Sequence, residues 1–179
     1  LEIACDAATG LLRIPVKGSS GGLGLRPRTP LAAGQSPEDL VGVDLDGDGN
    51  QDLATADAAG GRVQVLLNEG AGVFPRARQG LYPETEEGAW DEPVALDAAP
   101  IYANAPDLVV ADWASRSLTV LANEGQGRFA GRRQELFIGH AVEDVHAADL
   151  DSDGDVDLAV SDGDAHYITV LYNNGQGTF

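Results

Sequence analysis

The chain has 179 residues and a formal net charge of −18, because 29 aspartates and glutamates outnumber 11 lysines and arginines. Such acidity argues against electrostatic binding to nucleic acid or to an anionic membrane. A hydrophobic fraction of 43% is sufficient for one folded domain. The uninterrupted apolar runs are far too short for membrane insertion. The single cysteine, Cys5, rules out an internal disulfide, and we expect it to be a small buried side chain.

In chain order, residues 1–36 look like a repeating unit that starts after its first strand and acidic loop. LEIACDAATGLLRIPV is similar to the later segment DLATADAAGGRVQVLL, and GGLGLRP is similar to GAGVFPR. The first strand and the acidic loop of this unit are then expected to precede Leu1. The chain therefore has the pattern of a cropped repeat array, which the parent polypeptide or a second copy of the chain would complete.

Three further units, 37–80, 81–135 and 136–179, contain the same closing phrase. It reads VQVLLNEGAGVF, LTVLANEGQGRF and ITVLYNNGQGTF, and its phenylalanines are 55 and 50 residues apart. Alternation of apolar and polar residues in this phrase predicts half-buried strands, and no window keeps the 3.6-residue apolar period of a helix. We expect four antiparallel strands in each unit. Three aspartates in equivalent turns are expected to close those turns by bonding their own backbone: Asp57, Asp112 and Asp162.

Two of these units contain a nine-residue acidic loop, DLDGDGNQD at 44–52 and DLDSDGDVD at 149–157. Aspartates at loop positions 1, 3, 5 and 9 provide the oxygen ligands that a hard cation requires, and glycine at position 6 allows the sharp turn. Position 12 carries Thr55 or Val160 instead of the EF-hand glutamate. We predict two Ca²⁺ ions per chain. The ligands are Asp44, Asp46, Asp48, Asp52 and the carbonyl of Asn50, and then Asp149, Asp151, Asp153, Asp157 and the carbonyl of Asp155.

The middle unit lacks this ligand set. AAPIYANAP separates Asp97 from Asp107, so the carboxylates of positions 3 and 5 are missing. We expect this loop to keep its shape by its own packing, without a metal.

The pattern D-x-D-x-D-G-x-x-D-L-A followed by V-x-V-L-x-N-x-G-x-G-x-F is close to complete at 44–74 and at 149–179. It resembles the FG-GAP-like, or VCBS-type, repeat, which is related to the calcium-binding blades of integrin α-subunit propellers. The resemblance implies a β-propeller outside the cell that is engaged in binding. Repeats of about 50 residues with four antiparallel strands are also typical of propeller blades. We therefore expect an all-β fold in which 1–179 is one incomplete propeller, with a partial blade at 1–36 and three full blades.

The expected function is non-catalytic adhesion or recognition of a protein or glycan ligand by a secreted or cell-surface module. His140, His146 and His166 show no catalytic or metal-binding spacing, and we expect structural roles for them. Two alternatives remain open. One is a part of a secreted polysaccharide-degrading or other hydrolytic enzyme, and the other is a lectin with Trp90 or Trp113 stacking on a sugar.

Overall fold

The computed structural model describes residues 30–75, 91–102, 105–163 and 166–179, together with the strand backbone at 4–6, 11–13 and 79–82. In this part of the chain, fourteen strands form four antiparallel sheets, and no helix is present. The all-β prediction is thus confirmed. A search of the same residues finds no helix with the length and apolar character needed to cross a membrane. Cys5 has no described side chain, and Trp90 lies outside the described residues.

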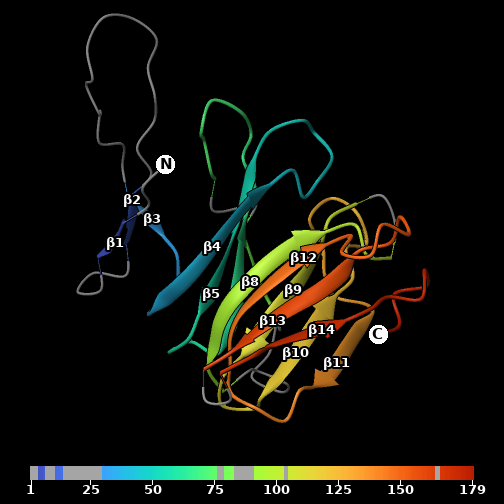
Figure 1. The fold of residues 1–179 in the computed structure, drawn as a ribbon. Coiled ribbons are helices and arrows are strands. Elements are labelled where there is room, and N and C mark those ends of the chain that lie inside the picture. The colour runs from blue at the N-terminus through green and yellow to red at the C-terminus, as the bar shows by residue number, and fades with distance from the viewer. Residues whose placement is uncertain are drawn as a thin grey trace, which may run out of the picture.

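The strands follow one another in chain order within each sheet (Figure 1). The first sheet contains β1 (Ala4–Asp6), β2 (Leu11–Arg13) and β3 (Leu31–Ala32). The second contains β4 (Pro37–Val43), β5 (Asp52–Asp57), β6 (Arg62–Leu66) and β7 (Gln79–Tyr82). The third contains β8 (Pro93–Ala99), β9 (Asp107–Asp112), β10 (Ser117–Leu121) and β11 (Arg133–Phe137). The fourth contains β12 (Val142–Ala148), β13 (Asp157–Asp162) and β14 (Ile168–Leu171).

The second, third and fourth sheets share one register, so their residues can be compared position by position. The last residue of the first strand pairs with an aspartate in each sheet, as Val43–Asp52, Ala99–Asp107 and Ala148–Asp157. A register shift falls near the start of β4, β8 and β12 at the same position. The repeats seen in the sequence are therefore structural repeats, and the acidic loops connect the first strand of a sheet to the second.

The sheets pack face to face through apolar side chains. One cluster joins the second sheet to the third and includes Val63, Val65, Leu96 and Leu108. Another joins the third to the fourth and includes Leu118, Val120, Val142 and Leu158. The second strands β5 and β9 are buried along their whole length, because each lies inside its sheet and is covered on both faces.

The first strands β4, β8 and β12 lie side by side and run toward the same end of the molecule (Figure 1). Asp39 Oδ2 on β4 accepts a hydrogen bond from the backbone N–H of Leu96 on β8 at 2.9 Å. Asp97 Oδ2 on β8 accepts one from the N–H of Ala147 on β12, also at 2.9 Å. Carboxylates thus link successive sheets along the line where their first strands meet.

Two expectations differ from the structure. We expected four strands in the last unit, whereas its described residues form three. In the second and third sheets the fourth strands, β7 and β11, lie beyond Phe74 and Phe129, whereas the described residues of the last unit run to Phe179, at the equivalent position. The aspartate at 57 also acts beyond its own turn: its Oδ1 accepts the N–H groups of Gln35 and Ser36, which precede β4, while its Oδ2 faces Gly60 in the turn. Asp112 Oδ1 accepts Ser115 N within its own turn, as expected.

Candidate metal sites

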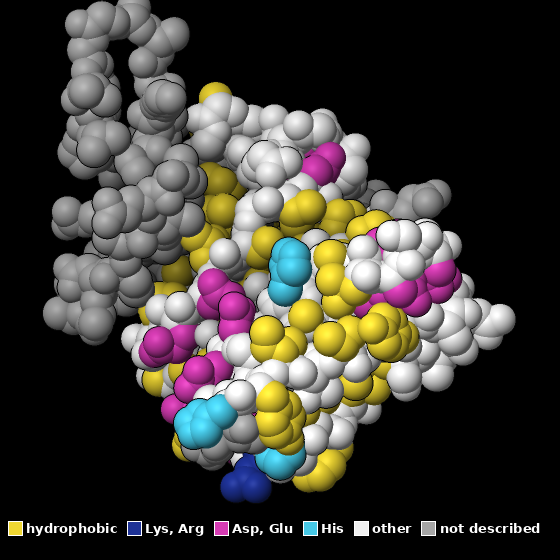
Figure 2. All heavy atoms as spheres, in the orientation of Figure 1, with side chains coloured by type: hydrophobic (Ala, Val, Ile, Leu, Met, Phe, Trp, Pro, Cys, Tyr) yellow, Lys and Arg dark blue, Asp and Glu magenta, His cyan; other side chains and the backbone are white. Residues whose placement is uncertain are grey.

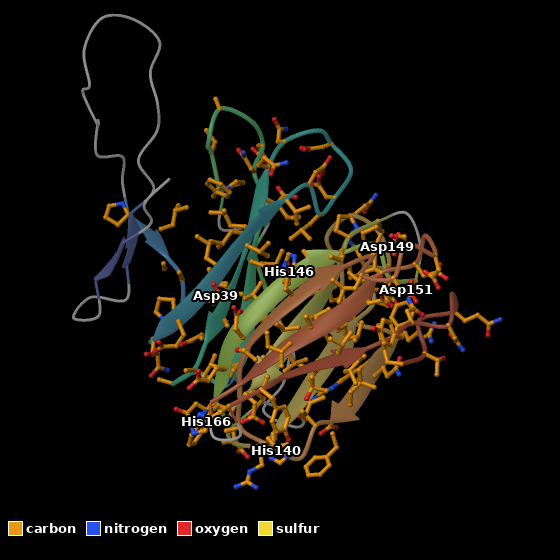
Figure 3. All side chains as sticks on the ribbon, in the orientation of Figure 1. Asp39, His140, His146, Asp149, Asp151 and His166 are labelled. Carbon is orange, nitrogen blue, oxygen red and sulfur yellow. The ribbon has the colours of Figure 1, made fainter. Side chains whose placement is uncertain are left out.

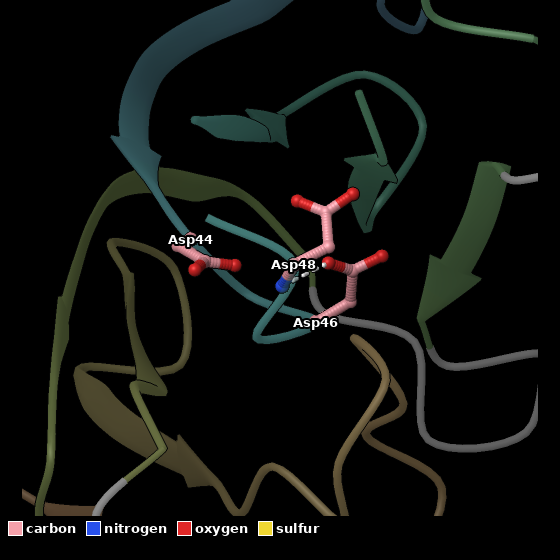
Figure 4. A group of neighbouring side chains, drawn as sticks. All are labelled: Asp44, Asp46 and Asp48. Carbon is pink, nitrogen blue, oxygen red and sulfur yellow. Dashed lines mark hydrogen bonds between the residues drawn. The ribbon is translucent and has the colours of Figure 1, made fainter. Parts of the chain in front are cut away.

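The first acidic loop brings three carboxylates together. Asp44, Asp46 and Asp48 follow the end of β4, and one carboxylate oxygen from each lies within 4.8 Å of the others. Figure 4 shows their side chains gathered at the turn of the loop. Carboxylates at such separations repel one another, and the repulsion becomes attraction when a cation lies between them.

Backbone N–H groups of the loop hold these carboxylates in place. Asp44 accepts from Gly47 N and Gly49 N, both at 2.8 Å. Asp46 accepts from Asp48 N at 3.2 Å (Figure 4). Asp48 accepts from Asn50 N at 2.8 Å. Gly49 has a φ of 86°, a conformation that glycine adopts without the strain of a Cβ. The alternating aspartates therefore bind the backbone N–H groups of their own loop and hold it around the carboxylates.

The second acidic loop repeats this geometry after β12. One carboxylate oxygen each from Asp149, Asp151 and Asp153 lies within 4.8 Å of the others. Asp149 accepts from Ser152 N at 2.7 Å and from Gly154 N at 3.1 Å. Desolvation within the loop raises the pKa of Asp151, and the negative charges of Asp153 and Asp157 raise it further. A cation would remove that electrostatic penalty.

The aspartate at loop position 9 lies apart from these clusters. Asp52 is fully buried, its Oδ2 accepts Leu45 N at 2.8 Å and its Oδ1 accepts Asn68 N at 2.7 Å. Asp157 makes the equivalent bonds with Leu150 N and Asn173 N. Burial raises the pKa of Asp52, and the two N–H bonds oppose that rise. The visible role of this position is to fasten the loop to the following turn.

The residues at loop position 7 are also outside the clusters, as expected for positions whose carbonyl was predicted to bind. The side chain of Asn50 faces Gly70, and the side chain of Asp155 faces Gly175. Both glycines belong to the Asn-x-Gly-x-Gly turn that follows the third strand. Position 7 thus connects the acidic loop to that turn.

The asparagine of that turn is a structural residue that the sequence analysis missed. Asn68 Nδ2 donates to the carbonyl of Gln51 at 3.0 Å, and its Oδ1 accepts Gly70 N and Val73 N. Asn173 bonds in the same manner to the carbonyl of Val156 and to Gly175 N and Gly177 N. Its recurrence in all three closing phrases is the sequence signal that indicates this role.

The middle loop is built differently. Asp107 accepts N–H groups from Ile101, Tyr102 and Asn123 at 3.0, 2.8 and 2.7 Å. Tyr102 stands where the other loops have Asp46 or Asp151, and its hydroxyl group donates to Gln134 at 2.8 Å. The guanidinium carbon of Arg132 lies 3.7 Å from the centroid of the Tyr102 ring. Described residues of this loop are therefore held by the carboxylate of Asp107, the ring of Tyr102 and the exposed guanidinium of Arg132.

The donor set of the two acidic loops fits a hard divalent cation. All converging atoms are carboxylate oxygens, the ligand type that Ca²⁺ and Mg²⁺ select, and neither thiolate nor imidazole lies among them. Asp48, Asp149, Asp151 and Asp153 are also exposed to solvent, so an ion can reach both loops.

The three histidines do not converge on these loops. Figure 3 places His140 and His166 at the end of the sheets opposite Asp149 and Asp151. His146 lies within β12 and is not part of either acidic loop. His146 Nδ1 is 3.2 Å from Asp97 Oδ2, and His140 packs edge-on against Tyr167. Trp113 is 42% exposed in the turn after β9.

A comparison with known protein families finds a match to part of this chain. The model of the FG-GAP-like repeat matches residues 104–160, which run from the middle loop into β13. A comparison with curated proteins gave no match. The matched segment includes the second acidic loop and the DLAV strand, which are motifs on which the resemblance was based. Residues 104–160 therefore match the FG-GAP-like repeat, and the resemblance seen in the motifs is confirmed for this segment.

Proposed function

We propose that the chain is a calcium-stabilised module of the β-propeller type that serves recognition or adhesion outside the cell. The observation that carries the proposal is the pair of three-carboxylate clusters, built by the same hydrogen bonds in two repeats. A site of this kind needs positive charge to balance its carboxylates, and a chain with a net charge of −18 has few cationic side chains that could provide it.

Calcium is the cation that these loops suit best. Ca²⁺ accepts irregular sets of carboxylate and carbonyl oxygens, whereas Mg²⁺ demands near-octahedral geometry and retains its waters. We assign one ion to Asp44, Asp46 and Asp48 with the carbonyl of Asn50, and one to Asp149, Asp151 and Asp153 with the carbonyl of Asp155. Asp52 and Asp157 complete the predicted sets, each from its buried position behind the loop. Bound calcium at a hundredfold excess over Kd would stabilise the folded state by about 2.7 kcal/mol per site.

The packing of the sheets supports the propeller interpretation. Blades of a propeller are antiparallel sheets that pack face to face, with their first strands nearest the central axis. Here β4, β8 and β12 lie side by side, joined by the bonds of Asp39 and Asp97 (Figure 1). In this arrangement, the acidic loops are brought to one end of the sheets, where calcium would hold a binding surface in shape.

Recognition is preferred over catalysis because, among the described residues, the titratable group outside the acidic loops has structural contacts: Asp39 and Asp97 join the first strands, and His146 lies 3.2 Å from Asp97. His140 and His166 are remote from those loops (Figure 3). Weak calcium sites suit extracellular fluid, where the ion is abundant. A protein or glycan on a cell or matrix surface is the class of ligand that we propose.

Calcium binding is tested by thermal unfolding of chelator-treated protein titrated with CaCl₂. We expect the melting temperature to rise, and Asp46→Ala or Asp151→Ala to reduce the rise by removing one site each. Asp91→Ala, which removes an exposed carboxylate outside the loops, serves as the control and should behave like the wild type. An unchanged melting temperature in millimolar calcium would refute the proposal.

The recognition role is tested separately, by adhesion of cells to the immobilised protein. Adhesion should require calcium and should fall for the double variant Asp46→Ala/Asp151→Ala but not for Asp91→Ala. Equal adhesion with and without chelator would argue against a calcium-stabilised binding surface.

A further inference from the structure

The turns between the second and third strands share one strained position. The second strand of each sheet begins after the loop and ends at its turn, so these turns lie at the end of the sheets opposite the acidic loops. Each turn runs from an aspartate to the backbone partner that closes it, as Asp57–Arg62, Asp112–Ser117 and Asp162–Tyr167. The residue before that partner has a left-handed φ, which is 60° at Gly61, 59° at Arg116 and 61° at His166. We call it the left-handed position.

Two of the three repeats place a basic side chain at the left-handed position. A Cβ is disfavoured at such a φ, so glycine is the residue that occupies it without strain. The second sheet has Gly61 there, whereas the third and fourth sheets have Arg116 and His166, which are both exposed. Backbone strain kept at an exposed side chain points to a use of that side chain outside the fold.

The turn of the third sheet also presents an aromatic ring. Trp113 lies in the same turn as Arg116 and is 42% exposed. The third sheet packs against the second sheet on one face and against the fourth on the other. Trp113 and Arg116 are therefore exposed at the end of a sheet that has a described neighbour on both faces.

His140 connects this turn to the turn of the fourth sheet. The carbonyl of Arg116 accepts the N–H of Gly139 at 3.3 Å, so the segment that enters β12 crosses this end of the third sheet. His140 is the next residue, and its ring packs edge-on against Tyr167 with centroids 5.5 Å apart. Its Nδ1 lies 3.9 Å from Oδ2 of the buried Asp162. The two turns and His140 thus form one continuous surface.

This surface combines an aromatic ring with polar groups of both signs. Figure 2 shows histidine, basic and hydrophobic side chains side by side at its lower end, where Figure 3 labels His140 and His166. Glu143 adds a carboxylate, because its Oε1 occupies the space that a Cβ of Gly163 would need. A strongly charged ligand of either sign would therefore meet a group of like charge here. A hydroxyl group, by contrast, can both donate and accept, so it can bond to guanidinium, imidazole and carboxylate groups alike.

We propose that the turn surface, formed by Trp113, Arg116, His140 and His166, binds a neutral glycan. The Trp113 indole stacks on the apolar face of a sugar ring, and the three basic side chains bond to its hydroxyl groups. The proposal rests on the recognition role proposed above and names the ligand class and the surface for it. It does not depend on calcium, because the acidic loops lie at the other end of the sheets.

The experiment is binding of the intact chain to an array of neutral and acidic oligosaccharides, followed by calorimetric titration with the neutral oligosaccharide that binds best. Trp113→Ala should weaken binding about tenfold or more. Arg116→Gly should weaken it by a similar factor without lowering the melting temperature, because glycine adopts this φ without strain. Gln126→Gly is the matched control, since Gln126 is also exposed and has a φ of 57° but lies in a turn beside the first acidic loop. It should bind like the wild type.

A wild-type chain that binds no neutral oligosaccharide, or binds only acidic ones, would overturn the proposal. So would equal weakening by Arg116→Gly and Gln126→Gly. If Trp113→Ala does not fold, as judged by circular dichroism, Arg116→Gly decides the result with the same expected direction. Calcium-dependent cell adhesion without glycan binding would refute this surface and leave the recognition role standing. Glycan binding without any calcium effect would support the surface and contradict the proposed metal sites alone.

Discussion

Replacing Asp107 by alanine tests how the loops are held, in the one loop without a carboxylate cluster among its described residues. The carboxylate is 1% exposed and accepts N–H groups from Ile101, Tyr102 and Asn123. The N–H of Ile101 also donates to the carbonyl of Ala99 at 3.0 Å, so two donors lose their acceptor. An unsatisfied buried donor costs about 1–3 kcal/mol, which gives about 2–6 kcal/mol for the pair.

Part of that loss is offset because the carboxylate itself is desolvated, as the raised pKa of Asp107 indicates. We therefore expect a net loss of about 2–4 kcal/mol in the free energy of unfolding. Urea denaturation followed by far-ultraviolet circular dichroism measures it, and Asp107→Asn, which keeps one acceptor, should lose about half as much. The loss should be the same with calcium and with chelator. A change below about 1 kcal/mol for the alanine variant would refute the reasoning.

Two further predictions use the links between sheets. Burial raises the pKa of Asp39 above its ordinary value of 3.8, and the charges of Asp144 and Asp97 raise it further. Its favourable contribution to stability is therefore complete below the ordinary pKa and is lost as pH rises through the raised folded-state pKa. In urea titrations from about pH 4 to about pH 7, the free energy of unfolding of the wild type should fall relative to that of Asp39→Asn as pH rises. Equal pH dependences of the two free energies would contradict this. Leu118→Ala should cost about 2–5 kcal/mol because the side chain is fully buried, whereas Ile168→Ala at the equivalent position should cost under about 1 kcal/mol in the monomer. Equal losses in the two variants would show that the fourth sheet is covered.

The strands were predictable because the chain repeats its own pattern. The phrase from the DLA strand to the motif phenylalanine recurs with nearly constant spacing, so each element was identified three times rather than once. The links between sheets were not predictable. Asp39 and Leu96 are 57 residues apart, and Asp97 and Ala147 are 50 apart. No local pattern says which carboxylate faces a neighbouring strand, because that depends on how the sheets stack.

The candidate metal sites were predictable in part for a similar reason. Spacing in sequence identified Asp44, Asp46 and Asp48 as neighbours, since a tight loop must bring them together. Spacing does not distinguish a ligand from a structural acceptor at Asp52, because both roles require a carboxylate in the same place. Burial of Asp52 and its bonds to Leu45 and Asn68 show a structural role in addition to the ligand role that we propose. Tyr102 could not have been foreseen as the replacement for a loop aspartate without the register of β8 and β9.

The most direct measurement of the central claim is the number of calcium ions bound per chain, by isothermal titration calorimetry of the chelator-treated protein. The two clusters of the described structure predict two ions, one lost in Asp46→Ala and the other in Asp151→Ala. Both should be lost in the double variant, while Asp107→Asn should keep two. A count of zero would contradict the assignment of the clusters as calcium sites. A count of three would show that the middle loop binds an ion without the carboxylates on which the account depends.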